Sequence, residues 1–227
     1  MEPFRRAFIR FLLECEALRF GDFTTKSGRK SPYFINTGMI RTGMQLARMG
    51  DFYAHTIEHH FGDSIDNLYG PAYKGIPLAV ASATALQRLY NRDFGVSFNR
   101  KEAKDHGEGG TIVGQPYDRP TRVLIVEDVI TAGTSVRETM ELMKSFPNAK
   151  VEGLIVSVDR MEKVGDSPLS ALQQVEREYG IRTVPIVTID DLMGALEDRS
   201  IRKLFPIPDG QIERMTAYRE EYGAKVR

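Results

Sequence analysis

The chain has 227 residues, of which 41% are hydrophobic and 27% charged, a composition typical of globular proteins and not of fibrous or disordered ones. Its 31 basic and 31 acidic residues balance, so no overall field attracts nucleic acid or an anionic membrane, and we expect neither as a partner. The single cysteine, Cys15, excludes an intrachain disulfide and favours a reducing compartment. The first segment, MEPFRRAFIRFLLECEALRF, lacks the apolar run of a signal peptide, and no run reaches the ~20 apolar residues of a membrane span. We therefore expect a cytoplasmic protein.

The N-terminal region predicts a helix followed by a hairpin. Apolar residues recur at helical spacing from Phe4 to Leu18, which indicates an amphipathic helix with Cys15 on its packed face. In FTTKSGRKSPYFIN, two β-prone runs flank Ser27 and Gly28, which indicates a hairpin-like element.

A second helix is predicted over residues 44–60. Its His55 and His59 have a spacing that could bind a metal, but no acid or cysteine completes the site, so we expect solvated surface histidines.

Strand and helix signals then alternate to the C-terminus. Strands are predicted at IDNLYG, GVSFN, RVLIVED, VEGLIVSVDR and VPIVTI. Helices are predicted at GIPLAVASATALQRLY, SVRETMELMKSF, SALQQVEREYG, DDLMGALED and IPDGQIERMTAYREEYG, the last with Asp209 as its N-cap. Continuous Val/Ile/Leu runs between helices indicate an α/β fold, with a central, mostly parallel sheet and helices on both faces.

The segment VLIVEDVITAGTS suggests a site for a ribose phosphate. Ligands of open α/β sheets bind at the carboxyl ends of strands, where this segment and the loops GPAYKG and NRKEAKDHGEGG all fall. The turn TAGTS offers backbone N–H groups and hydroxyls at a helix N-terminus, a suitable cradle for phosphate. Glu127 and Asp128 would repel that phosphate unless they hold sugar hydroxyls or a bridging divalent cation. The alternative is a solvated strand end followed by an ordinary helix entry.

These segments carry a family resemblance. VLIVEDVITAGTS resembles the phosphoribosyl pyrophosphate (PRPP) signature of type I phosphoribosyltransferases, and FTTKSGRKSPYFIN, GPAYKGIPLA and NRKEAKDHGEGG together resemble the orotate phosphoribosyltransferase family. The resemblance implies pentosyl transfer from PRPP to orotate with Mg²⁺, giving orotidine 5′-monophosphate and pyrophosphate in de novo pyrimidine synthesis. It also implies one domain over residues 1–227, with residues 1–40 as a hood over the base site. Residues 100–113 would form a mobile lid that reaches the neighbouring subunit of a homodimer.

The resemblance further implies the residues of the site. Catalytic roles are expected of Lys104, His106 and Asp128. PRPP is expected to bind Lys26, Tyr73, Lys74, Arg100, Lys101, Lys104, His106, Glu127, Asp128, Val129, Ile130, Thr131, Ala132, Gly133, Thr134 and Ser135. Orotate is expected to bind Lys26, Phe34, Ile35, Thr131 and Arg160. No protein ligand to the metal is expected, because Mg²⁺ would be held mainly through substrate oxygens and water.

Two departures and two rival functions accompany this hypothesis. Glu127 stands where the family often has aspartate, and Ile35 where a second phenylalanine is common; Arg160 could alternatively form a strand-end salt bridge. A phosphoribosyltransferase for a purine or uracil would leave KSGRKSPYF without a role. A non-catalytic ribose-phosphate sensor that binds RNA would need a basic face and no lid, whereas the net charge is zero and RKEAKDH is complete.

Overall fold

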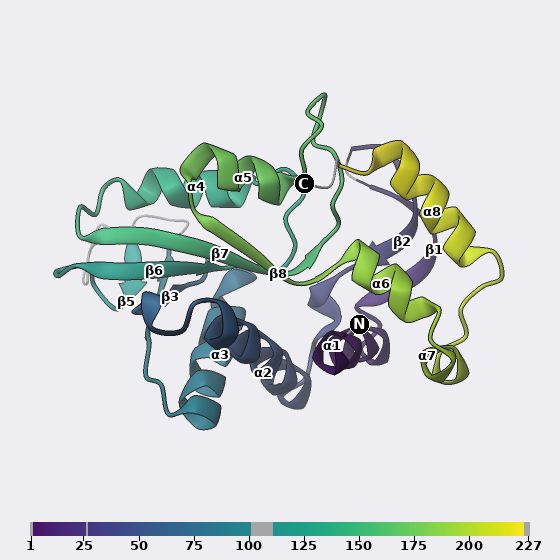
Figure 1. Cartoon of the computed structure of the whole chain (residues 1–227). Coiled ribbons are helices and arrows are strands. Elements are labelled where there is room, and N and C mark those ends of the chain that lie inside the picture. Colours follow the sequence, from purple (N-terminus) through teal and green to yellow (C-terminus); the bar gives the residue numbers. More distant parts are fainter. Residues whose placement is uncertain (1, 26, 101–110, 225–227) are drawn as a thin grey trace. The chain divides into compact units, whose positions relative to one another are not determined.

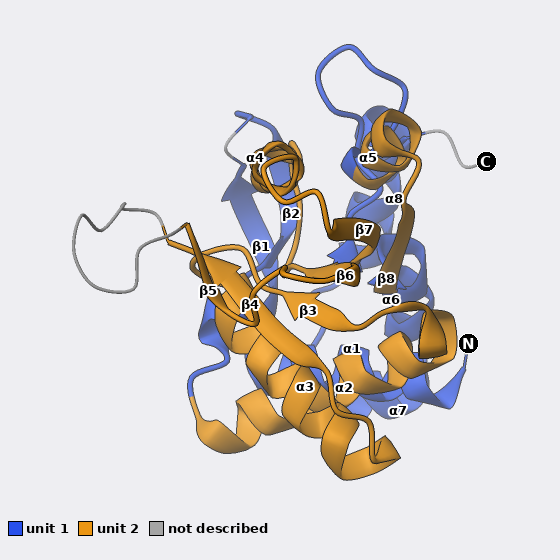
Figure 2. Ribbon diagram, turned by 90° about the vertical axis from the view of Figure 1, so that its left-hand side faces the viewer, with its two compact units in different colours: residues 1–41, 158–171, 187–227 blue, residues 42–157, 172–186 orange. Residues whose placement is uncertain are grey.

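The computed structural model describes residues 2–25, 27–100 and 111–224, and the chain forms two compact units (Figures 1 and 2). Unit 1 comprises Met1–Arg41, Val158–Ala171 and Val187–Arg227, and unit 2 comprises Thr42–Ser157 and Leu172–Ile186. The predicted hood, residues 1–40, falls within unit 1. Most of the predicted lid, residues 101–110, lies outside the described residues.

Unit 2 is built on a six-stranded sheet with the order β5-β4-β3-β6-β7-β8. The strands are β3 (Asn67–Tyr69), β4 (Gly95–Asn99), β5 (Ile112–Gly114), β6 (Thr121–Val126), β7 (Ala149–Asp159) and β8 (Arg182–Thr188), of which β7 and β8 have their last residues in unit 1. Strands β4, β3, β6 and β7 pair in parallel, whereas β5 pairs with β4 antiparallel. The short strand β5, at the end of the charged loop, was not predicted.

Helices cover both faces of this sheet. They are α2 (Gly43–His60), α3 (Gly75–Tyr90), α4 (Thr134–Met143) and α5 (Ala171–Tyr179), with a 3-10 turn at Gly62–Ser64. Helices α2 and α3 lie on one face, and α4 and α5 on the other (Figures 1 and 2). Because both faces are covered, Val123 to Val126 of β6 are fully buried, which explains the continuous apolar run. The predicted α/β fold is confirmed.

Local signals account for the limits of these helices. Thr42 and Gln45 form a capping box at the start of α2, and Asn91 ends α3 in the left-handed conformation. His55 and His59 are exposed as predicted, and nowhere in the described ranges do three potential metal-ligating side chains cluster. Nor does any described helix have the length and apolar character needed to cross a membrane.

The pairing of β6 with β7 contains a register shift. Val123 is opposite Val151, but Leu124 is opposite Gly153, so Glu152 is an extra residue on β7. A side chain at Gly153 would collide with the ring of Phe61 and approach the carbonyl oxygen of Arg182 to 2.9 Å. The strand therefore needs glycine immediately after the bulge.

In its described residues, unit 1 combines a hairpin with four α-helices. Its elements are α1 (Pro3–Glu14), β1 (Leu18–Thr24), β2 (Lys30–Ile35), a 3-10 turn (Thr37–Met39), α6 (Ile189–Leu196), α7 (Arg199–Leu204) and α8 (Gln211–Tyr222). Strands β1 and β2 are antiparallel, which confirms the predicted hairpin. Helix α8 packs against it: the Tyr218 ring meets Tyr33 edge-on at 5.9 Å, and Gln211 Nε2 donates to the Pro32 carbonyl at 2.8 Å.

Two predictions in unit 1 are wrong, and one described helix was not predicted. Leu18 begins β1 instead of continuing the first helix, because the chain turns at Glu16, whose φ is 53°. Asp209 is not the cap of α8; Gly210, at φ 71°, precedes the first helical residue, Gln211. The short helix α7, capped by Asp198, was not predicted. Cys15 is buried on the packed side of the chain, as expected.

Candidate active site

Glu127 and Asp128 directly follow β6 in unit 2, and both are buried, with 7% and 8% of their surface exposed. Burial raises the pKa of the Glu127 carboxyl above its ordinary value, because the charged form loses hydration. Asp128 has a cationic partner: Lys74 Nζ lies 3.1 Å from its Oδ2. The end of β6 thus presents two carboxylates, one of them already neutralised by a lysine.

The loop after the acids leads into the N-terminus of α4. Gly133 has a φ of 71°, a conformation that favours glycine, and Thr134 begins the helix. Thr131, Ala132 and Thr134 are exposed and Ser135 is half-buried, so hydroxyls and the positive end of the helix dipole face solvent together. This arrangement suits an incoming phosphate.

Arg137 braces this loop and was missed in the sequence. Its Nη1 donates to the carbonyl of Ala132 at 2.6 Å, and its Nε donates to Glu178 of α5 at 3.1 Å. The arginine lies one helical turn after Gly133, but a contact with a loop carbonyl cannot be recognised from that spacing. Arg137 therefore ties the TAGTS loop to α5.

The turn after β3 brings Tyr73 and Lys74 to the adjacent strand end, since β3 pairs directly with β6. The turn is tight: a side chain on Gly70 would collide with the Gly75 carbonyl, and one on Gly75 would lie 2.8 Å from the Val126 carbonyl. Tyr73 is 68% exposed. Both side chains are thus accessible to a ligand held over the acid pair.

Arg100 lies at the end of β4, on the wall of a cavity of about 370 Å³ that also includes Ser135 and Ala72. Its Nε is buried and has no hydrogen-bond partner in the part of the chain that the structure describes. An unpaired guanidinium donor beside Ser135 of the TAGTS loop is suited to an anion. Asn99 Oδ1 accepts a bond from the backbone N–H of Ala72 at 2.8 Å, which ties the ends of β3 and β4 together.

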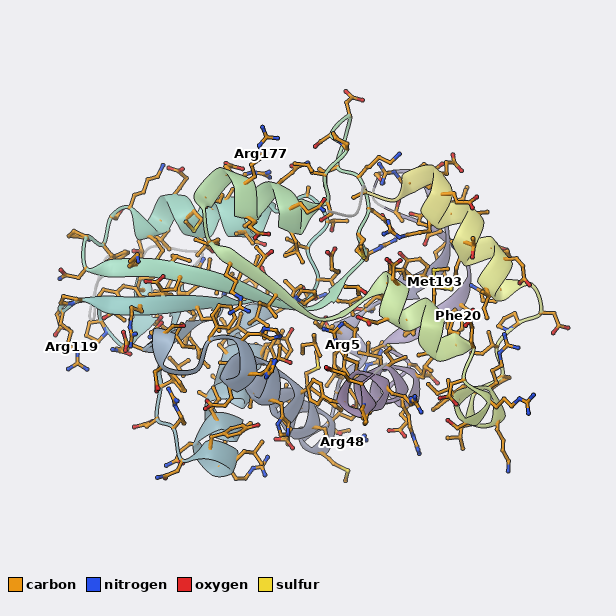
Figure 3. The ribbon with its side chains drawn as sticks, viewed as in Figure 1. Arg5, Phe20, Arg48, Arg119, Arg177 and Met193 are labelled. Carbon is orange, nitrogen blue, oxygen red and sulfur yellow. The ribbon has the colours of Figure 1, made fainter. Side chains whose placement is uncertain are left out.

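A larger cavity, of about 830 Å³, lies at the opposite, amino ends of these strands. Two of its arginines are already paired: Arg92 with Asp63 at 2.8 Å and Arg122 with Asp66 at 2.7 Å. Arg119 projects outward from the loop before β6 (Figure 3). The size of this cavity therefore does not make it the better anion site, because carboxylates already pair with two of its arginines.

The predicted orotate contacts Phe34, Ile35 and Arg160 all belong to unit 1. The Phe34 ring stacks on Phe23 at 5.3 Å, and Ile35 is 9% exposed. Arg160 forms a partly buried salt bridge, with its Nη2 2.6 Å from Glu162 Oε1.

The partners of Arg160 were not found from the sequence. Its guanidinium lies over the ring of Tyr33, 5.0 Å from the centroid, and the Tyr33 hydroxyl donates to Glu162 at 3.0 Å. Burial raises the pKa of the Tyr33 hydroxyl, which therefore stays a donor. The strand-end salt bridge considered as an alternative for Arg160 is thus present.

The remaining predicted residues, Lys26, Lys101, Lys104 and His106, lie outside the described residues. The acid pair offers oxygen ligands of the kind that Mg²⁺ accepts, but only two carboxylates, so further ligands would come from substrate and water.

Comparison with known proteins decides the family. The phosphoribosyl transferase domain family matches residues 36–185. The orotate phosphoribosyltransferase of Lachnoclostridium phytofermentans is 46% identical over 226 residues, covering 100% of both chains, and that of Clostridium beijerinckii is 47% identical over 99% of this chain and 100% of its own. The chain belongs to the orotate phosphoribosyltransferase family.

Solved structures agree with that assignment. The orotate phosphoribosyltransferase of Francisella tularensis has a TM-score of 0.81 and 38% identity, over 96% of this chain and 99% of its own. The UMP synthase of Leishmania donovani, at 24% identity and a TM-score of 0.72, shares the fold over 95% of this chain and 42% of its own. The type I phosphoribosyltransferase fold expected from the sequence is confirmed.

Proposed function

We propose that the protein is an orotate phosphoribosyltransferase, which transfers the ribose 5-phosphate group of PRPP to orotate and releases pyrophosphate. The geometry that supports this lies in unit 2, where the acid pair, the TAGTS loop and Lys74 meet at the ends of two adjacent strands. The full-length similarity to curated enzymes of that name supports orotate as the acceptor. The product, orotidine 5′-monophosphate, belongs to de novo pyrimidine synthesis.

Different residues of unit 2 bind the three parts of PRPP: the 5-phosphate, the ribose and the pyrophosphate. The backbone and hydroxyls of residues 131–135 bind the 5-phosphate at the N-terminus of α4. Glu127 and Asp128 accept hydrogen bonds from the ribose hydroxyls, while Tyr73, Lys74 and Arg100 hold the pyrophosphate. The side chain of Lys74 is 60% exposed, so it can exchange Asp128 for a pyrophosphate oxygen at little cost. Val129 and Ile130 connect the acids to the phosphate loop.

Charge development determines what these residues contribute to the rate. When the bond at the anomeric carbon breaks, the ribose ring becomes positive and pyrophosphate becomes more negative. In this proposal Glu127 and Asp128 stabilise the positive charge that develops on the ribose ring. Lys74 and Arg100 stabilise the negative charge that develops on the departing pyrophosphate. Mg²⁺, held by substrate oxygens and water near the acid pair, would neutralise pyrophosphate when bound.

The remaining predicted roles complete the proposal. Arg160, Phe34 and Ile35 of unit 1 recognise orotate, together with Lys26 and Thr131. Lys101, Lys104 and His106 belong to a lid that closes over the reacting groups and is shared across a homodimer. The protein acts in the cytoplasm.

A spectrophotometric assay tests the function. Orotate consumption should require PRPP and Mg²⁺, and removing the metal with a chelator should abolish it. Uracil, adenine and hypoxanthine in place of orotate should give little product. Product formation with one of these bases and none with orotate would refute the assignment of the acceptor.

A further inference from the structure

We propose that Tyr53 and Ser157 are positioning residues that set the affinity for PRPP by fixing the backbone of the acid pair. This inference rests on the proposed role of Glu127 and Asp128 in holding the ribose. Neither Tyr53 nor Ser157 stands out in the sequence, because one lies within a helix and the other within a buried strand.

Each of the two hydroxyls donates a hydrogen bond to the backbone carbonyl of one acid. Tyr53 extends from α2 and its hydroxyl donates to the carbonyl of Glu127 at 2.6 Å. Ser157 of β7 donates to the carbonyl of Asp128 twice, from Oγ at 2.6 Å and from its N–H at 2.7 Å. Tyr53 and Ser157 are fully buried, with 0% of their surface exposed, so water cannot replace these donors readily.

All four backbone polar groups of the acid pair are satisfied. The N–H of Glu127 donates to the Ile155 carbonyl at 3.0 Å, and the N–H of Asp128 donates to Glu127 Oε2 at 3.2 Å. The two carbonyls receive the hydroxyls of Tyr53 and Ser157. Strand β6 ends at Val126. The two hydroxyls therefore bond to backbone carbonyls that lie just beyond the end of the strand. A buried carbonyl that loses its donor is costly, and the chain can relieve the cost by rotating its peptide group.

Rotation of either peptide group would move a carboxylate. Binding groups must stay within about 0.5 Å of the productive geometry to keep their effect. Removal of a donor should therefore weaken PRPP binding by displacing the acids, in addition to any loss of stability. The displaced carboxylates are those proposed to bind the ribose hydroxyls, so the affinity for orotate should not change.

Matched control variants are available in unit 2. Tyr117 has a buried hydroxyl, 2.7 Å from Ser97 Oγ, and Ser82 Oγ donates to the Leu78 carbonyl at 2.6 Å. Neither bond involves the acid pair. Tyr117→Phe and Ser82→Ala therefore remove buried hydroxyls of the same kinds as Tyr53→Phe and Ser157→Ala.

The experiment measures PRPP affinity by calorimetry, the KM values for both substrates, and the unfolding temperature of these four variants. We expect Tyr53→Phe and Ser157→Ala to raise the Kd and KM for PRPP about three- to tenfold, the equivalent of one net hydrogen bond, with the KM for orotate unchanged. The two controls should lower the unfolding temperature similarly and leave PRPP affinity intact. PRPP affinities that match the controls would overturn the proposal.

A double-mutant cycle separates positioning from general stability. If Ser157 acts through Asp128, Ser157→Ala should have little further effect on PRPP affinity in an Asp128→Asn protein, whereas full additivity would overturn this role. Calorimetric PRPP binding needs no orotate. A wild-type protein that binds PRPP but does not consume orotate would refute the proposed acceptor and still allow this test.

Discussion

Asp128→Asn should weaken PRPP binding while leaving the fold nearly intact. The carboxylate side chain is 12% exposed, and Asn has the same shape, so the main loss is the charge that strengthens hydrogen bonds to the ribose hydroxyls. That loss is about 1–3 kcal/mol, or about five- to 150-fold in Kd. The ion pair with Lys74 is also lost. Because the lysine side chain is 60% exposed, this contributes only about 0–1 kcal/mol and lowers the unfolding temperature by at most about 4 °C.

The measurements are calorimetric titration with PRPP and Mg²⁺ and thermal unfolding, with Asp66→Asn as the control. Asp66 accepts hydrogen bonds from the side chain of Arg122, which lower its pKa from 3.8 to about 2. A lowered pKa means that the stabilisation is present above pH 3.8 and is lost as the pH falls towards 2. Asp66→Asn should therefore lower stability at neutral pH, flatten the acid unfolding profile, and leave PRPP affinity unchanged. Unchanged PRPP affinity in folded Asp128→Asn protein would remove Asp128 from the site.

Three further variants test other parts of the site. Arg137→Ala removes the donor to the Ala132 carbonyl and should raise the KM for PRPP about three- to tenfold with the KM for orotate unchanged; a shift in orotate KM alone would contradict the bracing role. Glu127→Gln should lower activity yet stabilise the fold at neutral pH, because the raised pKa of Glu127 makes stability fall as pH rises above the ordinary carboxyl range. The higher unfolding temperature of Glu127→Gln relative to wild type should disappear at acidic pH. A difference that does not depend on pH would exclude ionisation of Glu127 as its cause. Arg160→Ala leaves Glu162 with the Tyr33 hydroxyl and with Arg29 at 3.7 Å, so it should destabilise the protein by about 1–3 kcal/mol and raise the KM for orotate more than that for PRPP. Equal effects on both KM values would argue against a specific role at the base.

Local sequence signals predicted most of the fold. The run GIPLAVASATALQRLY coincides with α3, which ends where Asn91 adopts the left-handed conformation. The cap of α8 was assigned wrongly because Asp209 and Gly210 are both plausible cap residues, and only the backbone conformation distinguishes them. The strand β5 is defined by pairing with β4, and three residues carry too little pattern to reveal it.

The candidate site was predicted where its residues adjoin in sequence. Glu127, Asp128 and the TAGTS loop form one continuous segment, and their chemistry can be read directly. Arg137, Tyr53 and Ser157 act through contacts with backbone carbonyls. Such contacts cannot be predicted from residue type or spacing, because a tyrosine, serine or arginine that bonds to a loop carbonyl is indistinguishable in the sequence from one that does not.

The extra residue in β7 places a constraint on the length of the chain. Leu124 lies opposite Gly153 because Glu152 is inserted before it, and the count from there brings Ser157 beside Asp128. Loss of that one extra residue would make the register regular and keep Ser157 beside Asp128, whereas an added residue between Gly153 and Ser157 would bring a neighbouring side chain, facing the other side of the sheet, next to the acid. The side chain of Glu152 forms an ion pair with the exposed Lys150, with 2.8 Å between Nζ and Oε1. The chain should therefore tolerate a one-residue deletion at the bulge better than a one-residue insertion between Gly153 and Ser157.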